Sequence, residues 1–180
     1  MAAQSVAEHG ISQLRLDEVL SAAGASKSQM YHYFSDRDGL VEAAVSHRCS
    51  EVLERLESAF ARVASFSDLE AVLSGFAADY ARQLTGCPIG TLAAELTDGP
   101  EGARRLVTDA FGSWERLLVD ALSRIRDNGG LTSEANPAEL ATGLLAAMEG
   151  GMLLGQVRED PGPLRVALAA GLGYIATFRN

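Results

Sequence analysis

Apolar residues recur at helical spacing along the whole chain, and this feature restricts the fold most. In residues 36–63 the intervals of three and four are clear, with Leu40, Val41, Ala44, Val45, Val52, Leu56 and Phe60 forming one stripe. No stretch alternates β-branched or aromatic residues with polar ones between turn signals, as strands require. The sequence therefore predicts an all-α protein.

Glycine, proline and capping residues divide this pattern into about nine helices. We expect them over residues 2–9, 15–23, 26–34, 36–63, 67–86, 89–97, 101–127, 136–160 and 164–178. The short helices come first and the long ones follow. This order predicts a three-helix N-terminal domain over residues 1–45 and a larger helical domain over residues 46–180.

The charge balance argues against a nucleic-acid binder at first sight. The 180 residues carry a formal net charge of −9 and a pI of about 4.8. Residues 1–48, however, hold four basic and six acidic residues, so most of the acidic excess lies further along the chain. The net charge therefore does not rule out a locally positive surface near the N-terminus.

Several classes of protein lack support in the sequence. Two cysteines, Cys49 and Cys87, are too few for a disulfide scaffold or a four-cysteine zinc site. No catalytic motif, phosphate loop, metal-ligand spacing, secretory signal or long uncharged apolar run is found. We therefore expect a cytoplasmic, non-enzymatic protein with no metal, no cofactor and no membrane contact.

Residues 16–34 fit a helix-turn-helix, two short helices that cross closely through small residues around Gly24. The residues expected in the shared core are Val19, Ala23, Ala25, Met30 and Tyr33. The second helix would then expose a polar set free of carboxylates, namely Lys27, Ser28, Gln29, Tyr31 and His32. Such a set suits phosphates and base edges, but a helical hairpin with a solvated face fits the periodicity equally well.

The stretch "AAGASKSQMYHYFSDRDGL", residues 22–40, resembles the signature of TetR-type transcriptional regulators. That family's pattern runs roughly A-A-G-V-S-K-G-T-[LI]-Y-x-[HY]-F-x-[SN]-K-[ED]-x-L. The helix order and chain length are similar as well. The resemblance implies a helix-turn-helix DNA-binding domain joined to a ligand-binding and dimerisation domain.

Carried over residue by residue, the resemblance implies DNA contacts at seven positions: Ser26, Lys27, Ser28, Gln29, Tyr31, His32 and Arg37. Ser26 also caps the recognition helix, and Arg37 stands where the family usually has lysine. Tyr33 and Phe34 are expected to pack the small domain.

For the larger domain the resemblance implies a small-molecule pocket. Its candidate lining is Phe76, Tyr80, Leu92, Glu95, Phe111, Trp114 and Met148, which suits an apolar or aromatic effector. For each apolar member taken singly, ordinary core packing is the favoured alternative. Glu95 and Glu149 are acids in apolar surroundings. Each either orients a ligand by a hydrogen bond, pairs with an arginine, or is a solvated or interface carboxylate, and the last is favoured over a ligand contact. Cys87 is expected to be a small buried hydrophobe.

The last two helices carry small and apolar residues suited to a two-fold partner, with Met152, Gly155, Leu168, Leu172 and Ile175 as the candidate interface. A homodimer would bind a pseudo-palindromic double-stranded DNA operator. The resemblance thus implies a repressor that a ligand releases through the long helix starting near Asp36. The alternative is a helical small-molecule or partner-binding protein without an operator.

The segment "GCPIGTLAAE", residues 86–95, resembles an element of the drug-efflux and flavonoid-responsive branch of the family.

Overall fold

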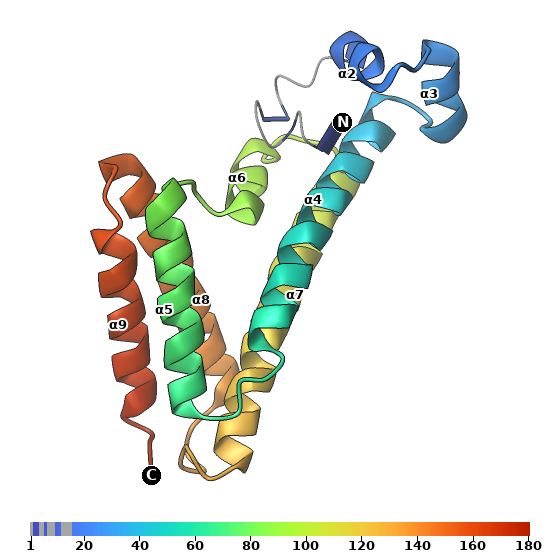
Figure 1. The fold of residues 1–180 in the computed structure, drawn as a ribbon. Helices are drawn as coiled ribbons and strands as arrows, with labels where there is room; N and C mark the ends of the chain where they lie inside the picture. The colour runs from blue at the N-terminus through green and yellow to red at the C-terminus, as the bar shows by residue number, and fades with distance from the viewer. Residues whose placement is uncertain (1, 4–5, 7–9, 12–15) are drawn as a thin grey trace. The chain divides into compact units, whose positions relative to one another are not determined.

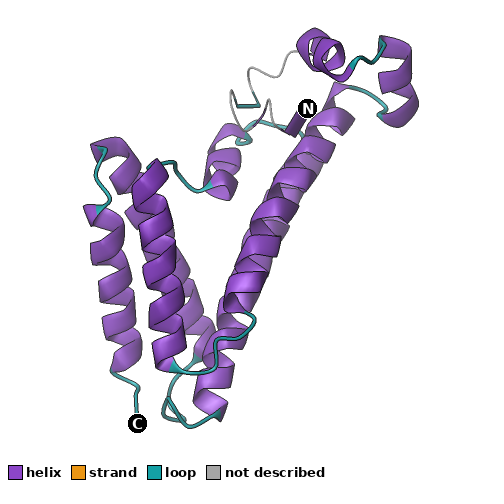
Figure 2. Ribbon diagram, in the orientation of Figure 1, coloured by secondary structure: helices purple, strands orange, loops and turns teal. Residues whose placement is uncertain are grey.

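The structure is a computed structural model that describes residues 2–3, 6, 10–11 and 16–180. Its eight named helices are α2 (Leu16–Ala23), α3 (Lys27–Tyr33), α4 (Arg37–Phe60), α5 (Phe66–Gln83), α6 (Pro88–Glu95), α7 (Glu101–Asp127), α8 (Pro137–Arg158) and α9 (Gly162–Ala176). Figure 2 shows helices and loops and no strand in the described part of the chain. The only β-type pairing among the described residues is an isolated bridge between Leu131 and Arg179. The all-α prediction is confirmed, and the eight helices agree closely with the nine expected. The helix predicted over residues 2–9 lies largely outside the described residues.

The chain forms two compact units. The first contains Met1–Leu53 and Pro88–Phe111, and the second contains Glu54–Cys87 and Gly112–Asn180. Helix α6 therefore belongs to the same unit as the helix-turn-helix, although it follows α5 in the chain (Figure 1).

A small apolar cluster holds the first unit's short helices together. Leu20 of α2, Met30 of α3 and Leu40 of α4 are buried against one another. Gly24 makes the turn between α2 and α3 at φ +61°, a left-handed conformation that glycine adopts at low cost. The short helices are thus fixed by one shared core, as the motif predicts.

In the second unit α8 packs along α9, and α5 lies beside α9 (Figure 1). Gly151 permits the close approach of α8 and α9, because a Cβ there would lie 2.8 Å from the Leu164 Cα. Tyr80 of α5 donates a hydrogen bond to the Met152 carbonyl oxygen of α8 at 2.8 Å. The largest buried side chain is Trp114 of α7.

Two helix boundaries differ from the sequence expectation for local reasons. Helix α5 begins at Phe66 because Ser65, not Ser67, forms a capping box with Asp68. Helix α4 ends at Phe60, and Arg124 of α7 donates to the carbonyl oxygens of Phe60 and Val63 at 2.7 and 2.9 Å. A distant side chain thus satisfies the carbonyl groups at this helix end.

Candidate functional site

Helix α3 presents almost its whole surface to solvent. Met30 is the one buried residue among its seven. The five residues expected to face outward, Lys27, Ser28, Gln29, Tyr31 and His32, are all exposed. A helix of this kind can enter a DNA groove without losing its own core.

A capping box fixes where α3 begins. The Gln29 N–H donates to the Ser26 Oγ at 3.2 Å, and the Ser26 N–H donates to the Gln29 Oε1 at 2.8 Å. The expected N-cap role of Ser26 is confirmed. Because each side-chain oxygen accepts from the other residue's main-chain N–H, the Gln29 amide nitrogen is the group of that side chain left to face a ligand.

Aromatic side chains lie on the outside of α3. Tyr31 is 55% exposed and Tyr33 is 77% exposed, and the His32 and Tyr33 rings meet edge to face at 5.1 Å. The prediction that Tyr33 packs the domain is therefore wrong: it lies three residues after Met30, but the chain leaves the helix at Phe34, which takes the core position. Phe34 is half-buried against the Leu20 cluster, as expected.

Ala23 was also expected in the shared core and is exposed. Val19, Leu20 and Met30 fill that core instead. Because Ala23 ends α2 just before the turn at Gly24, its small side chain lies beyond the closest contact of the two helices.

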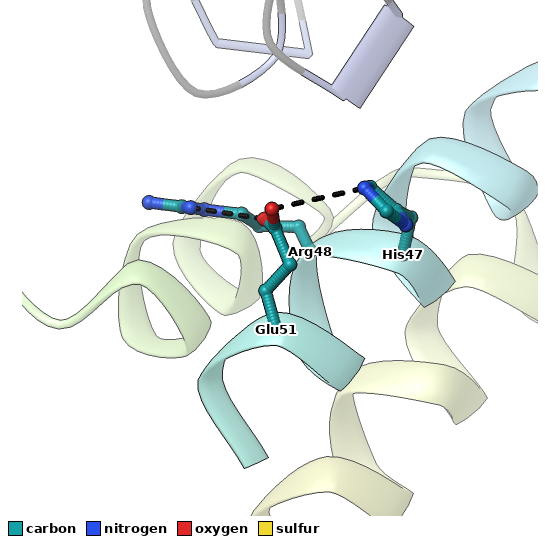
Figure 3. A network of polar contacts seen from close by, with 3 residues as sticks. All are labelled: His47, Arg48 and Glu51. Atoms are coloured by element: carbon teal, nitrogen blue, oxygen red, sulfur yellow. Dashed lines mark hydrogen bonds and ion pairs between the residues drawn. The ribbon is translucent and has the colours of Figure 1, made fainter. Parts of the chain in front are cut away.

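Two of the three described Lys and Arg residues up to Arg48 form ion pairs with carboxylates. The Lys27 Nζ lies 3.0 Å from the Asp17 Oδ1 of α2, and both side chains are well exposed. Further along α4, Arg48 pairs with Glu51 at 3.1 Å, and the same carboxylate lies 3.7 Å from the His47 Nε2 (Figure 3). Among the described Lys and Arg residues up to Arg48, Arg37 alone has no carboxylate partner.

Arg37 occupies the first position of α4. Asp36 precedes it and accepts a hydrogen bond from the Gly39 N–H at 2.8 Å. A cation at a helix N-terminus is electrostatically unfavourable, since the helix dipole prefers negative charge there. An incoming phosphate would be attracted by both the guanidinium and the helix end.

The predicted pocket residues fall into both units, and each group is described separately. In the second unit the rings of Phe76 and Trp114 lie 6.4 Å apart, and Tyr80 and Met148 are buried. In the first unit Leu92 is buried and Phe111 is half-buried. Glu95 accepts a hydrogen bond from the Ile11 N–H at 2.6 Å, a main-chain partner that sequence spacing had not indicated.

In the second unit the half-buried Glu149 of α8 pairs with the buried Cys87. Burial raises the pKa of the Glu149 carboxyl, and a hydrogen bond from the Cys87 thiol partly opposes this shift. The second oxygen, Oε1, is buried without a hydrogen-bond partner in the described part of the chain. Cys87 is buried as expected, but its bond to Glu149 was not predicted.

An open groove of about 530 Å³ runs between α5 and α9. Its walls are small and apolar, with Ala77, Ala78 and Leu168 among them, and Arg165 and Ser74 supply its polar groups. The sequence did not predict this groove, because its alanine and leucine lining carries no motif, and Leu168 and Leu172 were assigned to the dimer interface instead.

The predicted interface residues face mostly inward. Met152, Gly155, Leu168 and Ile175 are buried within the chain, and Leu172 is half-buried. Other faces of the same two helices expose large apolar side chains, namely Leu153, Leu154, Val157, Val166 and Tyr174.

One described helix, α8, has the length and mean hydropathy of a membrane span, and 39% of its most apolar window is buried inside the structure. Core helices of soluble proteins pass the same test. Within the described residues no three His, Cys, Asp or Glu side chains are grouped to hold a metal ion.

Comparison with known proteins assigns the family. Residues 1–44 match "Bacterial regulatory proteins, tetR family", and residues 66–170 match "Tetracyclin repressor-like, C-terminal domain". The repressor NemR of Escherichia coli is 28% identical over 177 residues, covering 94% of this chain and 87% of its own length. The regulator AcuR of Cereibacter sphaeroides is 25% identical over 169 residues, covering 89% and 75%.

Solved structures agree with this assignment. The reduced form of E. coli NemR superposes with a TM-score of 0.81 at 26% identity, covering 97% of this chain and 92% of that one. A regulator from Cytophaga hutchinsonii gives 0.84 at 17% identity, covering 99% and 90%, and supports the fold alone. With the exposed, capped α3, these matches show that the chain belongs to the TetR family of DNA-binding transcriptional regulators, which respond to ligands.

Proposed function

We propose that the protein is a homodimeric, cytoplasmic repressor that a small apolar or aromatic molecule releases from a pseudo-palindromic operator. In this proposal residues 1–45 bind DNA, and residues 46–180 bind the ligand and the second subunit. The exposure of α3, with Met30 as its single buried residue, carries the proposal. A helix with so little core of its own is positioned to present side chains to a partner.

The proposed DNA contacts divide by chemistry. Ser26 and Gln29 set the start of the recognition helix, while Ser28, Tyr31 and His32 offer hydrogen bonds to phosphates or base edges. Lys27 and Arg37 supply the positive charge. We add the exposed Tyr33, whose hydroxyl lies on the same short helix.

For the effector we propose a site in the second unit near Phe76, Tyr80, Trp114 and Met148. The Phe76 and Trp114 rings form an aromatic pair, which supports an apolar or aromatic ligand. Leu92, Glu95 and Phe111 belong to the first unit, and Glu95 already has a main-chain partner, so we place no ligand contact there.

For the dimer we propose the exposed apolar faces of α8 and α9, including Val157 at 74% and Val166 at 70% exposed. The buried Met152, Gly155, Leu168 and Ile175 then hold α8 against α9 inside each subunit. This use of α8 accounts for its high hydropathy without a membrane. A two-fold axis would place two recognition helices about 34–36 Å apart, one turn of DNA.

Selection of genomic DNA fragments by the purified protein tests the operator, with Tyr31→Ala/Arg37→Ala as the site variant. Arg82→Ala is the matched control, because it removes an exposed arginine from α5. We expect one pseudo-palindrome to be enriched by the wild type and the control but not by the site variant. Transcription from a promoter carrying that sequence should then fall when protein is added. The same fragments enriched by all three proteins would contradict the proposed interface.

A further inference from the structure

We propose that the groove between α5 and α9 is a second small-molecule site, which takes a carboxylate with an unbranched apolar chain and holds the charged end at Arg165. All of its lining residues belong to the second unit. The inference goes beyond the proposed function, because it adds a ligand class and a site separate from the effector site and the dimer face.

Alanines give the groove its width. Leu73 of α5 and Leu168 of α9 are buried and form its floor. Both sides are lined by residues with only one methyl group, namely Ala77, Ala78, Ala81 and Ala169. The volume of about 530 Å³ is that of a small-molecule pocket. From residue 73 to residue 81 helix α5 advances about 12 Å, so the groove suits a narrow, extended chain.

One positive charge lies in this apolar lining. Arg165 is the only charged lining residue, and Ser74 is the only other one with a polar side chain. Arg165 is exposed, and within the described part of the chain its guanidinium has no carboxylate partner. The nearby Asp160 carboxylate accepts a hydrogen bond from the Gly162 N–H at 2.9 Å. The Arg165 guanidinium can therefore donate two parallel hydrogen bonds to an acid from outside the chain.

The start of α9 adds to this attraction for an anion. Arg165 lies in the first turn of α9, where no acidic residue offsets the partial positive charge of the helix end. Figure 1 shows that α5 and α9 run in opposite directions, so the groove extends from this charged end toward Ser74 and Leu172. A carboxylate bound at Arg165 would therefore place its chain along the alanines.

The groove is separate from the two surfaces proposed above. Phe76 and Tyr80 also belong to α5, but the Phe76 ring meets Trp114 of α7, and the Tyr80 hydroxyl donates to the Met152 carbonyl oxygen of α8. None of these four residues lines the groove, and neither does the exposed Val166 of the proposed dimer face. A ligand in the groove thus meets other side chains than the effector or the second subunit.

The chemistry of the lining restricts the ligand to an anion with an apolar body. A single guanidinium balances one negative charge, which favours a monoanion such as a carboxylate. The alanines offer no side-chain hydrogen bonds, so polar groups along the chain would lose those they make with water. An acid without a chain would gain only an exposed ion pair, which water screens. Both the charge and the chain are therefore needed.

Isothermal titration calorimetry of the full-length protein tests the site with three probes. Octanoate has the charge and the chain, 1-octanol has the chain alone, and acetate has the charge alone. We expect octanoate to bind at least about tenfold more tightly than either of the others. Arg165→Gln should weaken octanoate about five- to tenfold and leave 1-octanol unchanged, whereas Arg165→Lys should retain most of the affinity. Arg158→Gln, which removes an exposed arginine from the end of α8, is the matched control.

A second pair of variants tests the apolar part of the site. Ala78→Phe fills part of the groove and should weaken octanoate about fivefold or more. Ala71→Phe makes the same change at an exposed position of α5 outside the lining and should leave the affinity unchanged. Urea unfolding checks that each variant is folded. If Ala78→Phe fails to fold, the exposed Arg165→Gln carries the test.

Equal octanoate affinity of Arg165→Gln and the wild type would overturn the proposed site, as would 1-octanol binding as tightly as octanoate. No octanoate binding by the wild type would overturn it as well. If Val166→Asp then bound octanoate, a second subunit rather than a carboxylate would be the occupant of the groove. The measurement contains no DNA, so its failure leaves operator binding intact, and absence of an operator would leave this site unaffected.

Discussion

Individual charges on the helix-turn-helix determine how it meets DNA. An exposed ion pair such as Lys27–Asp17 contributes little to stability, since water screens both groups. If Lys27 contacts DNA as proposed, a carboxylate 3.0 Å from its Nζ competes with phosphate for the same cation. We therefore expect Asp17 to lower the attraction of α3 for DNA.

Replacing Asp17 with Asn should strengthen operator binding. We expect affinity to rise roughly three- to tenfold at low salt and the salt dependence to steepen by about one phosphate per subunit. Anisotropy titrations over a series of salt concentrations measure both. Asp98→Asn changes the net charge equally in the exposed turn after α6 and should have a smaller effect. Weaker operator binding by Asp17→Asn would instead show that Asp17 positions Lys27 for its DNA contact rather than competing with phosphate for it.

Glu149 should make stability depend on pH. Burial raises the pKa of the Glu149 carboxyl in the folded state above its usual range, so ionisation disfavours folding. The stability that the protonated Glu149 carboxyl contributes is therefore fully present below the pKa of the unfolded state. It is lost as the pH rises through the pKa of the folded state. Glu149→Gln should gain stability relative to wild type as pH rises from about 5 to about 8. Urea unfolding across this range measures the difference, and a constant difference would contradict it. The exposed Glu70→Gln is the control.

At the scale of elements, close packing of α8 on α9 depends on a glycine. A Cβ at Gly151 would lie 2.8 Å from the Leu164 Cα and 3.0 Å from the Ala167 Cβ, both on α9. Gly151→Ala should therefore lower the free energy of unfolding by about 1–3 kcal/mol. At Gly75 of α5 a Cβ meets nothing within 4 Å, so Gly75→Ala should gain up to about 1 kcal/mol from helix propensity. Urea unfolding compares the two, and equal stability of Gly151→Ala and wild type would refute the contact.

The sequence predicts the helices well but not every boundary. Gly24 and the Asn136–Pro137 pair indicate their helix ends correctly, because turn and cap chemistry is local. At the end of α4 the Phe60 carbonyl oxygen accepts a hydrogen bond from Arg124, which lies far along the chain. Local sequence patterns do not indicate a partner so far along the chain, so the sequence predicts a helix that continues to residue 63.

The sequence does not distinguish the faces of α8 and α9 for a similar reason. Both helices are apolar on several sides, so periodicity does not separate the side that packs within the subunit from the side left exposed. Met152 and Val157 are both apolar members of α8, yet the first is buried and the second is exposed. The Cys87–Glu149 pair and the Glu95–Ile11 contact likewise join distant segments and carry no sequence signal.

For the whole molecule, the exposed apolar faces of α8 and α9 should control assembly. Val166→Asp places a charge in the proposed interface and should shift the protein toward monomers. Operator binding should weaken at the same protein concentrations. Analytical ultracentrifugation measures the dimer. Ala71→Asp adds the same charge to an exposed position of α5 and serves as control. Dissociation by Ala71→Asp but not by Val166→Asp would relocate the interface to α5.

The acidic molecule as a whole binds DNA only if its few cations are placed at phosphates. The salt dependence of binding to the selected operator and to a scrambled sequence tests this most directly. For the wild type we expect tighter binding to the operator at every salt concentration and a steep negative slope. Arg37→Ala should reduce that slope by about two per dimer, one phosphate for each subunit. Equal binding to both sequences, or a slope unchanged by Arg37→Ala, would contradict the account.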